Sequence, residues 1–299
     1  MARHNLVFML GFITSIQIQR SVNQDPYAMV YVSVARGPRS VGDHKHHLKC
    51  DNVLVMCRDK DIIQEMETWE MYDIVEIKGT IAAKSVNKGS HCQSCGAKNT
   101  AEGVIVYINP IFGKKRGHLT DEEACLNYLA ENQEVSNQAF IFGTLCRDPK
   151  KITPKEGLIV TQYQIAINRK FRIQADPPEI RTDYPWVKSY GENAISDREH
   201  LHTGSQVFVD GCIQARKVNR HAVCIKCGQK YDWADRAMEI VPFETEYIAN
   251  FYTEEEIAEN KAKVAAQKTR SVLMSLKGIE LPDDEYSDDD IKAGIDSDA

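Results

Sequence analysis

An internal duplication limits how this chain can fold more than any other feature of its sequence. Residues that lie 132 positions apart match in type and in order along the chain. The matched pairs are Phe8 and Phe140, Gly11 and Gly143, Tyr31 and Tyr163, Asp51 and Asp183, Gly79 and Gly211, Cys92 and Cys224, Cys95 and Cys227, and Pro110 and Pro242. Similarity at a fixed spacing indicates a repeated structural module. We therefore expect two copies of one module, joined by a spacer near residues 117 to 137.

The hydrophobic pattern predicts short β-strands and one brief helix in each copy. The expected strands are residues 5–18, 29–35, 48–57, 73–84 and 103–108 in the first copy, and 138–145, 160–168, 184–190, 206–218 and 237–241 in the second. Helices are expected at 59–69, where Asp59 can cap the first turn, and at 195–201. Three strands, a helix and two strands is the order of an OB barrel. The predicted fold class is thus mainly β, with two tandem OB-fold barrels.

Composition and turn signals divide the rest of the chain. The expected division is a first barrel with its C-x-x-C knuckle at 1–116, a partly helical linker at 117–137, a second barrel with its knuckle at 138–250, a C-terminal helix at 251–278 and a disordered acidic tail at 279–299. The helix is expected because residues 253–276 are rich in Glu, Ala and Lys. Thr253 and Glu256 have the spacing of a capping box at its start.

Charge is distributed unevenly between the tail and the rest of the chain. Residues 279–299 hold nine acidic residues and one lysine, a net charge of −8 out of a total of −6 for the whole chain. The remaining residues therefore carry +2, which permits a local basic groove. The acidic run is expected to compete with an anionic ligand or to recruit replication or repair proteins, although solubility alone is the other interpretation.

The sequence contains no feature that indicates a membrane protein or an enzyme. No stretch of about 18 apolar residues could span a bilayer, and Thr14, Gln17 and Gln19 interrupt the apolar N-terminal segment. Four of the nine cysteines form two C-x-x-C pairs, which in a reducing compartment indicates metal binding more than disulfides. We expect a soluble, cytoplasmic protein without membrane contact. There is no Gly-rich phosphate loop and no clustered carboxylate motif, so no enzymatic activity is expected.

Four segments of the second copy resemble, in order, the bacterial and phage single-stranded DNA-binding protein family. They are Phe142–Pro149, Gln164–Arg172, Tyr190–Ala194 and Leu201–Gly211. The resemblance covers roughly residues 138 to 220, and it implies an OB barrel that binds single-stranded DNA with little sequence specificity. It also implies a role in replication, recombination or repair, in a bacterial, plasmid or phage context. The chain departs from the family pattern in its duplication, its C-x-x-C pairs and its final residues Asp298 and Ala299.

A binder of this kind needs flat aromatic side chains for the bases and cations for the phosphates. In an extended strand Trp186, Lys188 and Tyr190 project from one face, and Phe171 lies between cations in the preceding loop. The predicted contacts are Tyr163, Arg169, Lys170, Phe171, Arg172, Trp186, Lys188, Tyr190, Arg216, Lys217 and Arg220 in the second copy, and Arg36, Lys49, Arg58, Lys84 and Lys88 in the first.

The predicted binding face has one alternative interpretation, and the first copy differs from the second at this face. Alternation along a strand does not say which face is inside, so Trp186 and Tyr163 can instead fill the barrel core. At the positions that match Trp186, Lys188 and Tyr190, the first copy has Leu54, Met56 and Arg58. The first copy is therefore expected to offer cations but no aromatic stack.

The cysteines Cys92, Cys95, Cys224 and Cys227 are the predicted ligands of Zn²⁺. A closed structural zinc site needs four ligands, and each C-x-x-C-Gly turn supplies two thiolates. One shared Cys₄ site treats the two copies alike and would clamp them together. The rival is two zincs, each completed locally; a redox pair or inert thiols are the remaining alternatives. The candidate extra ligands are Cys50 or Cys57 in the first copy and His221 or Cys212 in the second.

Several alternatives for the whole chain stay open at this point. His44, His46 and His47 can bind metal, but a polar loop is the favoured interpretation. The chain can also be a structural or adaptor subunit of a replication or transcription assembly, or a single-stranded RNA-binding protein, since base stacking does not depend on the sugar. A homo-oligomer is compatible with each of these readings.

Overall fold

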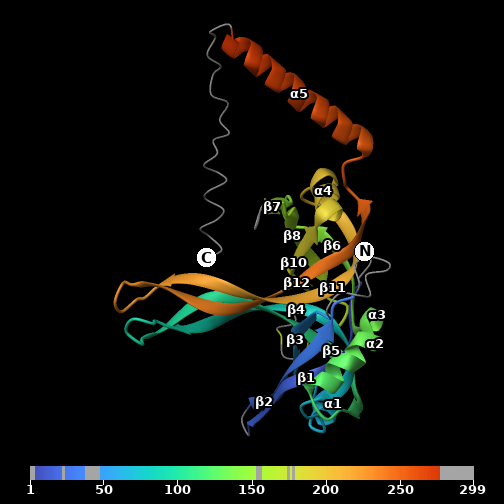
Figure 1. Cartoon of the computed structure of the whole chain (residues 1–299), viewed down its shortest axis with the longest axis vertical. Coiled ribbons are helices and arrows are strands. Elements are labelled where there is room, and N and C mark those ends of the chain that lie inside the picture. The colour runs from blue at the N-terminus through green and yellow to red at the C-terminus, as the bar shows by residue number, and fades with distance from the viewer. Residues whose placement is uncertain are drawn as a thin grey trace. The chain divides into compact units, whose positions relative to one another are not determined.

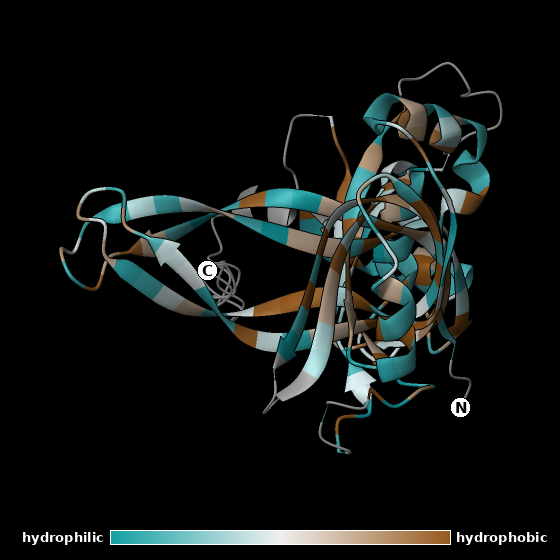
Figure 2. Cartoon of the chain, turned by 90° about the horizontal axis from the view of Figure 1, so that it is seen from below, coloured by the Kyte–Doolittle hydropathy of each residue, from teal (hydrophilic) through white to brown (hydrophobic). Residues whose placement is uncertain are grey.

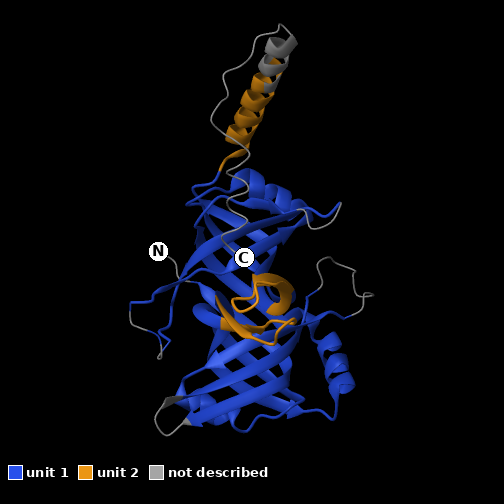
Figure 3. Ribbon diagram, turned by 90° about the vertical axis from the view of Figure 1, so that its left-hand side faces the viewer, with its two compact units in different colours: residues 1–87, 102–217, 236–251 blue, residues 88–101, 218–235, 252–299 orange. Residues whose placement is uncertain are grey.

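The computed structural model describes residues 4–21, 24–37, 48–152, 157–173, 176 and 179–276. Contacts divide the chain into two units. The first unit contains residues 1–87, 102–217 and 236–251, and the second contains residues 88–101, 218–235 and 252–299 (Figure 3). This division does not follow the repeat, because both barrels lie in the first unit and both C-x-x-C turns lie in the second. The domain boundaries expected from the repeat therefore stay a prediction.

The first copy forms a closed barrel (Figure 1). Its strands are β1 (Asn5–Ser21), β2 (Gln24–Ala35), β3 (Cys50–Cys57), β4 (Asp73–His91) and β5 (Lys98–His118). Neighbouring strands follow the order β1-β2-β3-β5-β4, and β4 pairs back with β1. The pairing of β3 with β5 is parallel at Val55 and Ile108. Helix α1 (Lys60–Met66) follows β3, and the Asp59 carboxylate accepts from two backbone N–H groups of its first turn, as predicted.

The second copy repeats this barrel. Its strands are β6 (Asn137–Leu145), β8 (Val160–Asn168), β10 (Trp186–Tyr190), β11 (Gln206–Val223) and β12 (Lys230–Ala249), and α4 (Gly191–His200) follows β10. The β6–β8 pairing closes the barrel, and Val187 pairs in parallel with Ile240. Two short strands, β7 (Lys150–Ile152) and β9 (Thr182–Asp183), add to β8. The mainly β fold class with OB barrels is confirmed.

Several strands are longer than expected, among them β4, β5, β11 and β12. Strands β4 and β11 continue beyond their predicted ends at residues 84 and 218. Strands β5 and β12 start before their predicted starts at residues 103 and 237. The ends of these strands are largely hydrophilic (Figure 2), so the hydrophobic alternation that marks a strand stops before the strand does. Helices α2 (Glu122–Glu131) and α3 (Gln133–Ser136) lie between β5 and β6, within the segment for which a partly helical linker was predicted.

The two barrels are joined by one antiparallel strand pair. Strand β1 pairs with β6, and the central partners Val7 and Ala139 are themselves 132 positions apart. Asn5 pairs with Ile141 and Asn137 with Met9, so exchanging the copies reproduces the same register. The pair therefore lies on a pseudo-twofold axis, and one continuous sheet runs through both barrels.

Buried polar groups repeat on both sides of this junction. The side chain of Asn5 donates to the carbonyl of Ile81 and accepts from its N–H, both at 2.9 Å. Asn137 does the same with Ile213, at 2.8 and 2.9 Å. Because both asparagines are buried, these bonds satisfy backbone groups that would otherwise be unpaired inside the protein.

Both copies have a glycine at the same point of the barrel, and a lack of space explains why no larger residue occurs there. A Cβ added at Gly79 would lie 2.7 Å from the carbonyl oxygen of Asn109, and one at Gly211 would collide with the carbonyl of Val241. These two contacts are equivalent in the two barrels, because β4 and β11 approach their neighbouring strands closely at the same point. Any larger residue would push the strands apart.

The C-terminal helix α5 spans Glu254–Leu276. The predicted capping box is present, since the backbone N–H of Thr253 donates to Glu256 at 2.8 Å and that of Glu256 donates to the Thr253 hydroxyl at 3.3 Å. Among the described residues, no helix is long and apolar enough to cross a membrane.

Candidate nucleic-acid interface and metal site

The outer face of β10 carries the aromatic side chains of the second copy. Residues 183, 185, 187 and 189 are buried, so alternation places Tyr184, Trp186 and Tyr190 on the outside. Trp186 lies opposite Gln164 of β8, and the Arg147 guanidinium lies 5.6 Å from its ring centroid. Tyr184 is 51% exposed. The same alternation that indicated Trp186 extends back to Tyr184, which is not among the predicted contacts.

The loop after β8 adds a further aromatic side chain. Phe171 is 38% exposed, and the ammonium of Lys170 lies 5.6 Å from its ring centroid. Lys170 and Arg172 are both exposed. These three residues therefore have the exposure that the predicted contact requires.

Lys188 lies on the same face but is not a free cation. Its ammonium lies 3.1 Å from the buried carboxylate of Glu239, which also accepts from Arg216 at 3.1 Å. Burial lowers the pKa of Lys188, and Glu239 opposes that shift. Lys188 is thus neutralised locally, and the exposed Arg216 provides the positive charge at this point of the face.

Tyr163 does not have the predicted role of a stacking platform. It is 0% exposed, and its hydroxyl donates to Asp197 at 3.1 Å inside the second barrel. Burial raises its pKa well above the ordinary value. The sequence had offered this core position as the alternative.

The reason is a one-residue change of offset in the second strand. Phe12 and Ile13 pair with Ser33 and Val32, whereas Thr144 and Leu145 pair with Ala166 and Ile165. Here equivalent residues are 133 positions apart, so the structural counterpart of Tyr163 is Val30 and that of Tyr31 is Gln164. A shift of one residue in a strand moves a side chain to the opposite face.

Arg169 and Arg36 are structural rather than free. The Arg169 guanidinium donates to Asp183 at 2.6 and 2.7 Å and to Asp176 at 2.7 Å. Arg36 makes the same bidentate contact with Asp51, at 2.5 and 2.8 Å. Since carboxylates already occupy these guanidinium groups, neither residue is an open phosphate site.

The aspartate of each pair also accepts a hydrogen bond from the backbone of the other copy. Asp183 accepts from the backbone N–H of Ala83 at 2.9 Å, and Asp51 accepts from that of Ala215 at 3.1 Å. Each copy therefore completes a hydrogen bond of the other. The arginine–aspartate pairs hold the barrel junction together instead of facing a ligand.

The first copy has an aromatic outer face, contrary to the prediction. Tyr31 of β2 is half-buried, lies opposite Leu54, and has the Arg236 guanidinium 5.1 Å from its ring centroid. Tyr27 lies on the same face of β2, 5.6 Å from the Arg58 guanidinium. The prediction rested on Leu54, Met56 and Arg58 at the third strand of this copy. The spacing of Tyr27 and Tyr31 in one strand was the signal that could have found them.

The remaining predicted cations fall into two groups. Lys49, Lys84, Lys217 and Arg172 are exposed and make no ion pair with another described residue. Lys88 and Arg220, in the second unit, both contact Asp235, at 2.6 and 2.9 Å. The first group keeps the free charge that a phosphate contact needs.

Four cysteines of the second unit form one cluster. Cys92 Sγ lies 3.7 Å from Cys227 Sγ, and Cys95 Sγ lies 3.6 Å from Cys224 Sγ. All four sulfurs lie within 4.8 Å of one another. Ligands about 2.3 Å from a tetrahedral zinc are about 3.8 Å apart, whereas a disulfide needs about 2.0 Å. The geometry fits one metal ion held by both copies.

The backbone around the cluster is the same in both knuckles. The N–H of Gly96 donates to the carbonyl of Cys92 at 2.8 Å, and that of Gly228 to the carbonyl of Cys224 at 2.9 Å. Both glycines have a φ of +69°, a conformation that side chains rarely adopt. The glycine after each C-x-x-C pair therefore allows the tight turn that aims two sulfurs at one point.

Strands β4 and β5 form a ribbon that ends in the first knuckle, and β11 and β12 form a ribbon that ends in the second. Asn99 of the first ribbon contacts the second knuckle. Its buried amide donates to Cys224 Sγ at 3.7 Å, and its oxygen accepts from the N–H of Ile225 at 3.0 Å. At the equivalent position Tyr231 reaches Ser90, with 2.7 Å between the hydroxyls. A ligand whose position is fixed by such a neighbour loses less freedom when it binds a metal.

The thiol pKa values reflect this crowding. Hydrogen bonds lower the pKa of the Cys224 thiol to about 6. The backbone N–H of Cys227 has the largest effect, and the backbone N–H of Lys226 and the side-chain amide of Asn99 act in the same direction. For Cys227 the backbone N–H of Gln229 acts in the same direction, but burial and the three neighbouring cysteines raise its pKa to about 12. Four thiolates this close repel one another, so only a bound cation would keep all of them ionised.

The locally completed alternative finds no support among the described residues. None of Cys50, Cys57, Cys212 and His221 belongs to a metal-ligand group there. Burial raises the pKa of Cys57 to about 11, which keeps it a neutral thiol. His221 Nδ1 lies 2.6 Å from an Asp232 oxygen. The histidines His44, His46 and His47, for which a polar loop was the favoured interpretation, lie outside the described residues, as does the tail at 279–299.

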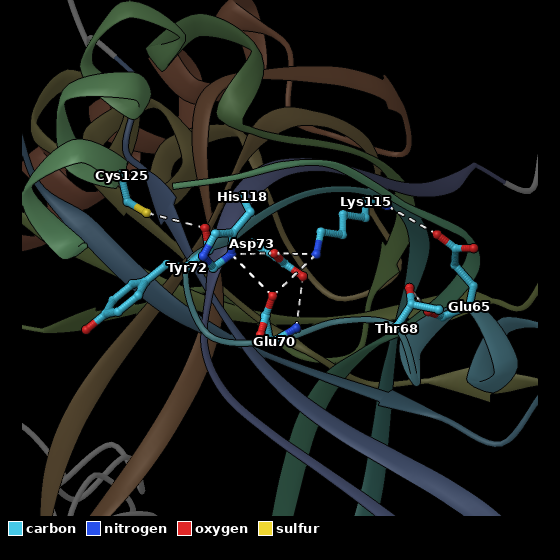
Figure 4. A network of polar contacts seen from close by, with 8 residues as sticks. All are labelled: Glu65, Thr68, Glu70, Tyr72, Asp73, Lys115, His118 and Cys125. Atoms are coloured by element: carbon cyan, nitrogen blue, oxygen red, sulfur yellow. Dashed lines mark hydrogen bonds and ion pairs between the residues drawn. The ribbon is translucent and has the colours of Figure 1, made fainter. Parts of the chain in front are cut away.

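A second group of possible metal ligands is already neutralised. Glu70, Asp73 and His118 offer ligand atoms within 4.8 Å of one another in the first barrel (Figure 4). The Lys115 ammonium lies 2.8 Å from the buried carboxylate of Asp73, and His118 lies 2.9 Å from it. This network joins the end of β5 to the start of β4, and its lysine takes the place that a cation would need.

Comparisons with known proteins support the resemblance of the second copy. Residues 136–223 match the model of the single-strand binding protein family. The single-stranded DNA-binding protein 2 of Chlorobaculum tepidum is 35% identical over 81 residues, which are 27% of this chain and 55% of that protein. The match thus spans about half of that relative's length. The predicted resemblance to this family is confirmed for the second copy.

Solved structures extend the similarity of fold to both copies. The wild-type single-stranded DNA-binding protein from Thermus aquaticus aligns with a TM-score of 0.53 and 15% identity, over 85% of this chain and 97% of its own. A deletion mutant of the same protein aligns with a TM-score of 0.54 and 17% identity, over 86% of this chain and all of its own. These matches show the fold, and the matched family is one of binding proteins, in agreement with the prediction that the chain is no enzyme.

Proposed function

We propose that this chain binds single-stranded DNA with little sequence specificity, through the outer faces of both barrels. The observation that carries the proposal is the set of aromatic rings on these faces, each with a cation beside it. Tyr27, Tyr31, Trp186 and Phe171 all have an arginine or lysine within 5.6 Å of the ring centroid. The names of the matched family and relatives support the same ligand.

The two kinds of side chain take the two parts of the ligand. Bases stack on the exposed rings, and such stacking is worth about 1 to 3 kcal/mol for each base. Phosphates contact the exposed cations Lys84, Lys170, Arg172 and Lys217, and release counterions when they do. Stacking does not distinguish among the bases, so the binding is expected to be nearly independent of sequence.

Titration with three ligands tests this function. Purified protein is titrated with poly-dT, with the RNA counterpart and with duplex DNA, each at two salt concentrations, and tryptophan fluorescence is followed. Single-stranded DNA should bind well above duplex, with an affinity that falls as salt rises. Equal affinity for duplex and single strand would contradict the proposal, and a preference for the RNA would make the protein an RNA binder.

The process that such binding serves is a further part of the proposal. We infer that the protein protects or organises single strands during replication, recombination or repair, because these are the processes that expose single-stranded DNA. The alternative of an adaptor subunit predicts weak affinity for bare oligonucleotides, so the same titration separates the two.

We also propose that the four cysteines bind one zinc ion. Thiolates in a tetrahedral arrangement favour zinc or iron among common metals. The ion would be held by Cys92 and Cys95 from one copy and Cys224 and Cys227 from the other. When bound it supplies no reaction chemistry, and instead fixes the two ribbon ends to each other.

Two associations complete the proposal. The tail at 279–299 is expected to compete with nucleic acid or to recruit replication or repair proteins, so its removal should raise affinity at low salt and have less effect at high salt. A homo-oligomer would form through the outer face of β1 and β6, where the half-buried Phe8 and Phe140 have ring centroids 6.3 Å apart. Sedimentation of a Phe8→Glu variant tests that contact: loss of association supports it, and an unchanged oligomer contradicts it.

A further inference from the structure

The second knuckle exposes large apolar side chains where the first does not. Ile225 lies between the two cysteines of its C-x-x-C pair and is 85% exposed. Val223 comes directly before the first of these cysteines and is 59% exposed. Ile225 has the largest exposed fraction among the exposed large hydrophobic residues of the described chain. Adjacent apolar side chains left in water at the end of a ribbon indicate a contact surface.

The knuckle fold does not require these residues. The first knuckle makes the same turn, with the same backbone hydrogen bonds and the same φ at its glycine. At the matching positions it has His91 and Gln93, which are exposed and polar. Since polar side chains occupy the same positions in an equivalent turn, the turn itself does not require Val223 and Ile225 to be apolar.

The charges around them favour an anionic ligand. Lys98, Lys226 and Lys230 are exposed and form no ion pair with another described residue. The two acidic residues of these ribbon ends are already engaged, since Asp232 contacts His221 and Asp235 contacts both Lys88 and Arg220. Free cations beside apolar side chains match the two parts of a single-stranded nucleic acid, its phosphates and its base faces.

We infer that the second knuckle is a nucleic-acid contact in its own right, in which Ile225 packs against bases while Lys226 and Lys230 contact phosphates. The inference rests on the proposed function, because it assigns the same ligand to a second surface. The knuckle belongs to the same chain as the barrels, so a strand that the barrels hold meets it as an intramolecular ligand. The first knuckle, with polar residues at the matching positions, is not part of this contact.

The test compares Ile225→Gln with the matched control Gln93→Ala on a long oligo-dT of about 60 nucleotides. Ile225→Gln gives the second knuckle the residue that the first one has. It should weaken binding by about three- to tenfold, because the apolar contact is lost. Gln93→Ala should bind as the wild type does. Metal content is measured for both variants, so that an effect on the cysteine cluster is recognised.

A second variant tests the phosphate contact. Lys226→Gln should reduce the slope of log affinity against log salt by about one, as expected for one lost phosphate contact. Unchanged affinity and salt slope in both knuckle variants, while the wild type binds, would overturn the inference and leave the proposed function intact. Failure of the wild type to bind any oligonucleotide would instead overturn the proposed function. If Ile225→Gln changes the oligomeric state, the occupant is a second copy of the chain and the inference is wrong.

Discussion

The two copies keep the same junction but build their outer faces differently. At one cross-strand position the first copy has Tyr31 beside Leu54, and the second has Gln164 beside Trp186. The aromatic ring is on β2 in one copy and on β10 in the other. Because cross-strand neighbours share one face of a sheet, either strand can supply the ring. An aromatic face can therefore persist although different strands supply its rings in the two copies.

The junction shows the opposite behaviour. Asn5 and Asn137, Asp51 and Asp183, and the four cysteines occur in equivalent pairs and make equivalent contacts. Each of these side chains satisfies a backbone group or a partner sulfur at a fixed distance, which few other residues could do. Geometry thus constrains the junction residue by residue, whereas the outer face is constrained only in its chemistry.

The largest effect is expected at the cysteine cluster. If both copies hold one ion, Cys92→Ser and Cys224→Ser should each reduce the metal content from one per chain to none, because a structural site needs all four ligands. Elemental analysis of purified protein measures this, with Cys146→Ser as a control that keeps its metal. Two metals per chain, each lost separately, would show that the copies do not share a site.

Asn99 gives a finer test of the same cluster. Asn99→Ala removes the amide that lies 3.7 Å from Cys224 Sγ, while all four ligands remain. Loss of such a supporting hydrogen bond typically costs about 10- to 100-fold in metal affinity. A competition titration with a chelator measures the change, and the exposed Lys98→Ala is the neighbouring control. An affinity equal to that of the wild type would mean that Asn99 does not support the site.

The buried asparagines test whether the junction is equivalent on both sides. Asn5→Ala and Asn137→Ala should each lower the free energy of unfolding by about 2 to 3 kcal/mol, since a backbone N–H and a carbonyl are left unpaired inside the protein. Urea denaturation measures both, with the exposed Asn219→Ala as control. Clearly different costs at the two sites would break the equivalence.

The outer faces are tested by one residue from each copy. Tyr31→Ala and Trp186→Ala should each weaken single-strand binding, measured by titration with poly-dT, by about 1 to 3 kcal/mol, because each removes a stacking surface. Melting curves of both variants separate this loss from any loss of packing, since Tyr31 also packs against the hydrophobic core. Gln164→Ala, at the position equivalent to Tyr31, should have little effect. If only Trp186→Ala matters, the first copy does not bind and the two faces are not equivalent in function.

The smallest effect concerns a turn that only the second copy has. The hydroxyl and backbone N–H of Thr203 donate to Asp148, and these bonds lower the pKa of its carboxyl. A lowered pKa stabilises the fold above the unfolded value near 4, and this stabilisation is lost as the pH falls through the folded value. Asp148 is exposed, so the contribution should stay below about 1 kcal/mol. Melting curves of Asp148→Asn should differ from the wild type at pH 7 and converge with it near pH 2.

The sequence predicts the barrels well because their signals are local and repeated. The strand alternation, the Asp59 cap, the capping box at Thr253 and the paired cysteines each follow from residues close together in the chain. The constant offset of 132 residues concealed the position of Tyr163, although Tyr163, Ile165 and Ile167 alternate with Gln162 and Gln164 along β8 in the pattern of a buried face. The ion pair of Lys188 could not be predicted, because its partner Glu239 is distant in the sequence.

The faces of the first copy show a different limit. Tyr27, Tyr31 and the Arg58 beside Tyr27 are visible in the sequence, but the cation beside Tyr31 is not, because Arg236 comes from the other copy. Contacts that cross between copies depend on how the two barrels are joined. Neither composition nor spacing carries that information.

The central claim is that the aromatic faces of both barrels hold the same kind of ligand. Photo-crosslinking tests it most directly: a bromodeoxyuridine oligonucleotide is bound to the full chain, irradiated, and the modified residues are identified by mass spectrometry. The account predicts crosslinks at Tyr27 or Tyr31 in the first copy and at Trp186, Tyr190 or Phe171 in the second. Crosslinks confined to one copy, or absent from both of these faces, would contradict it.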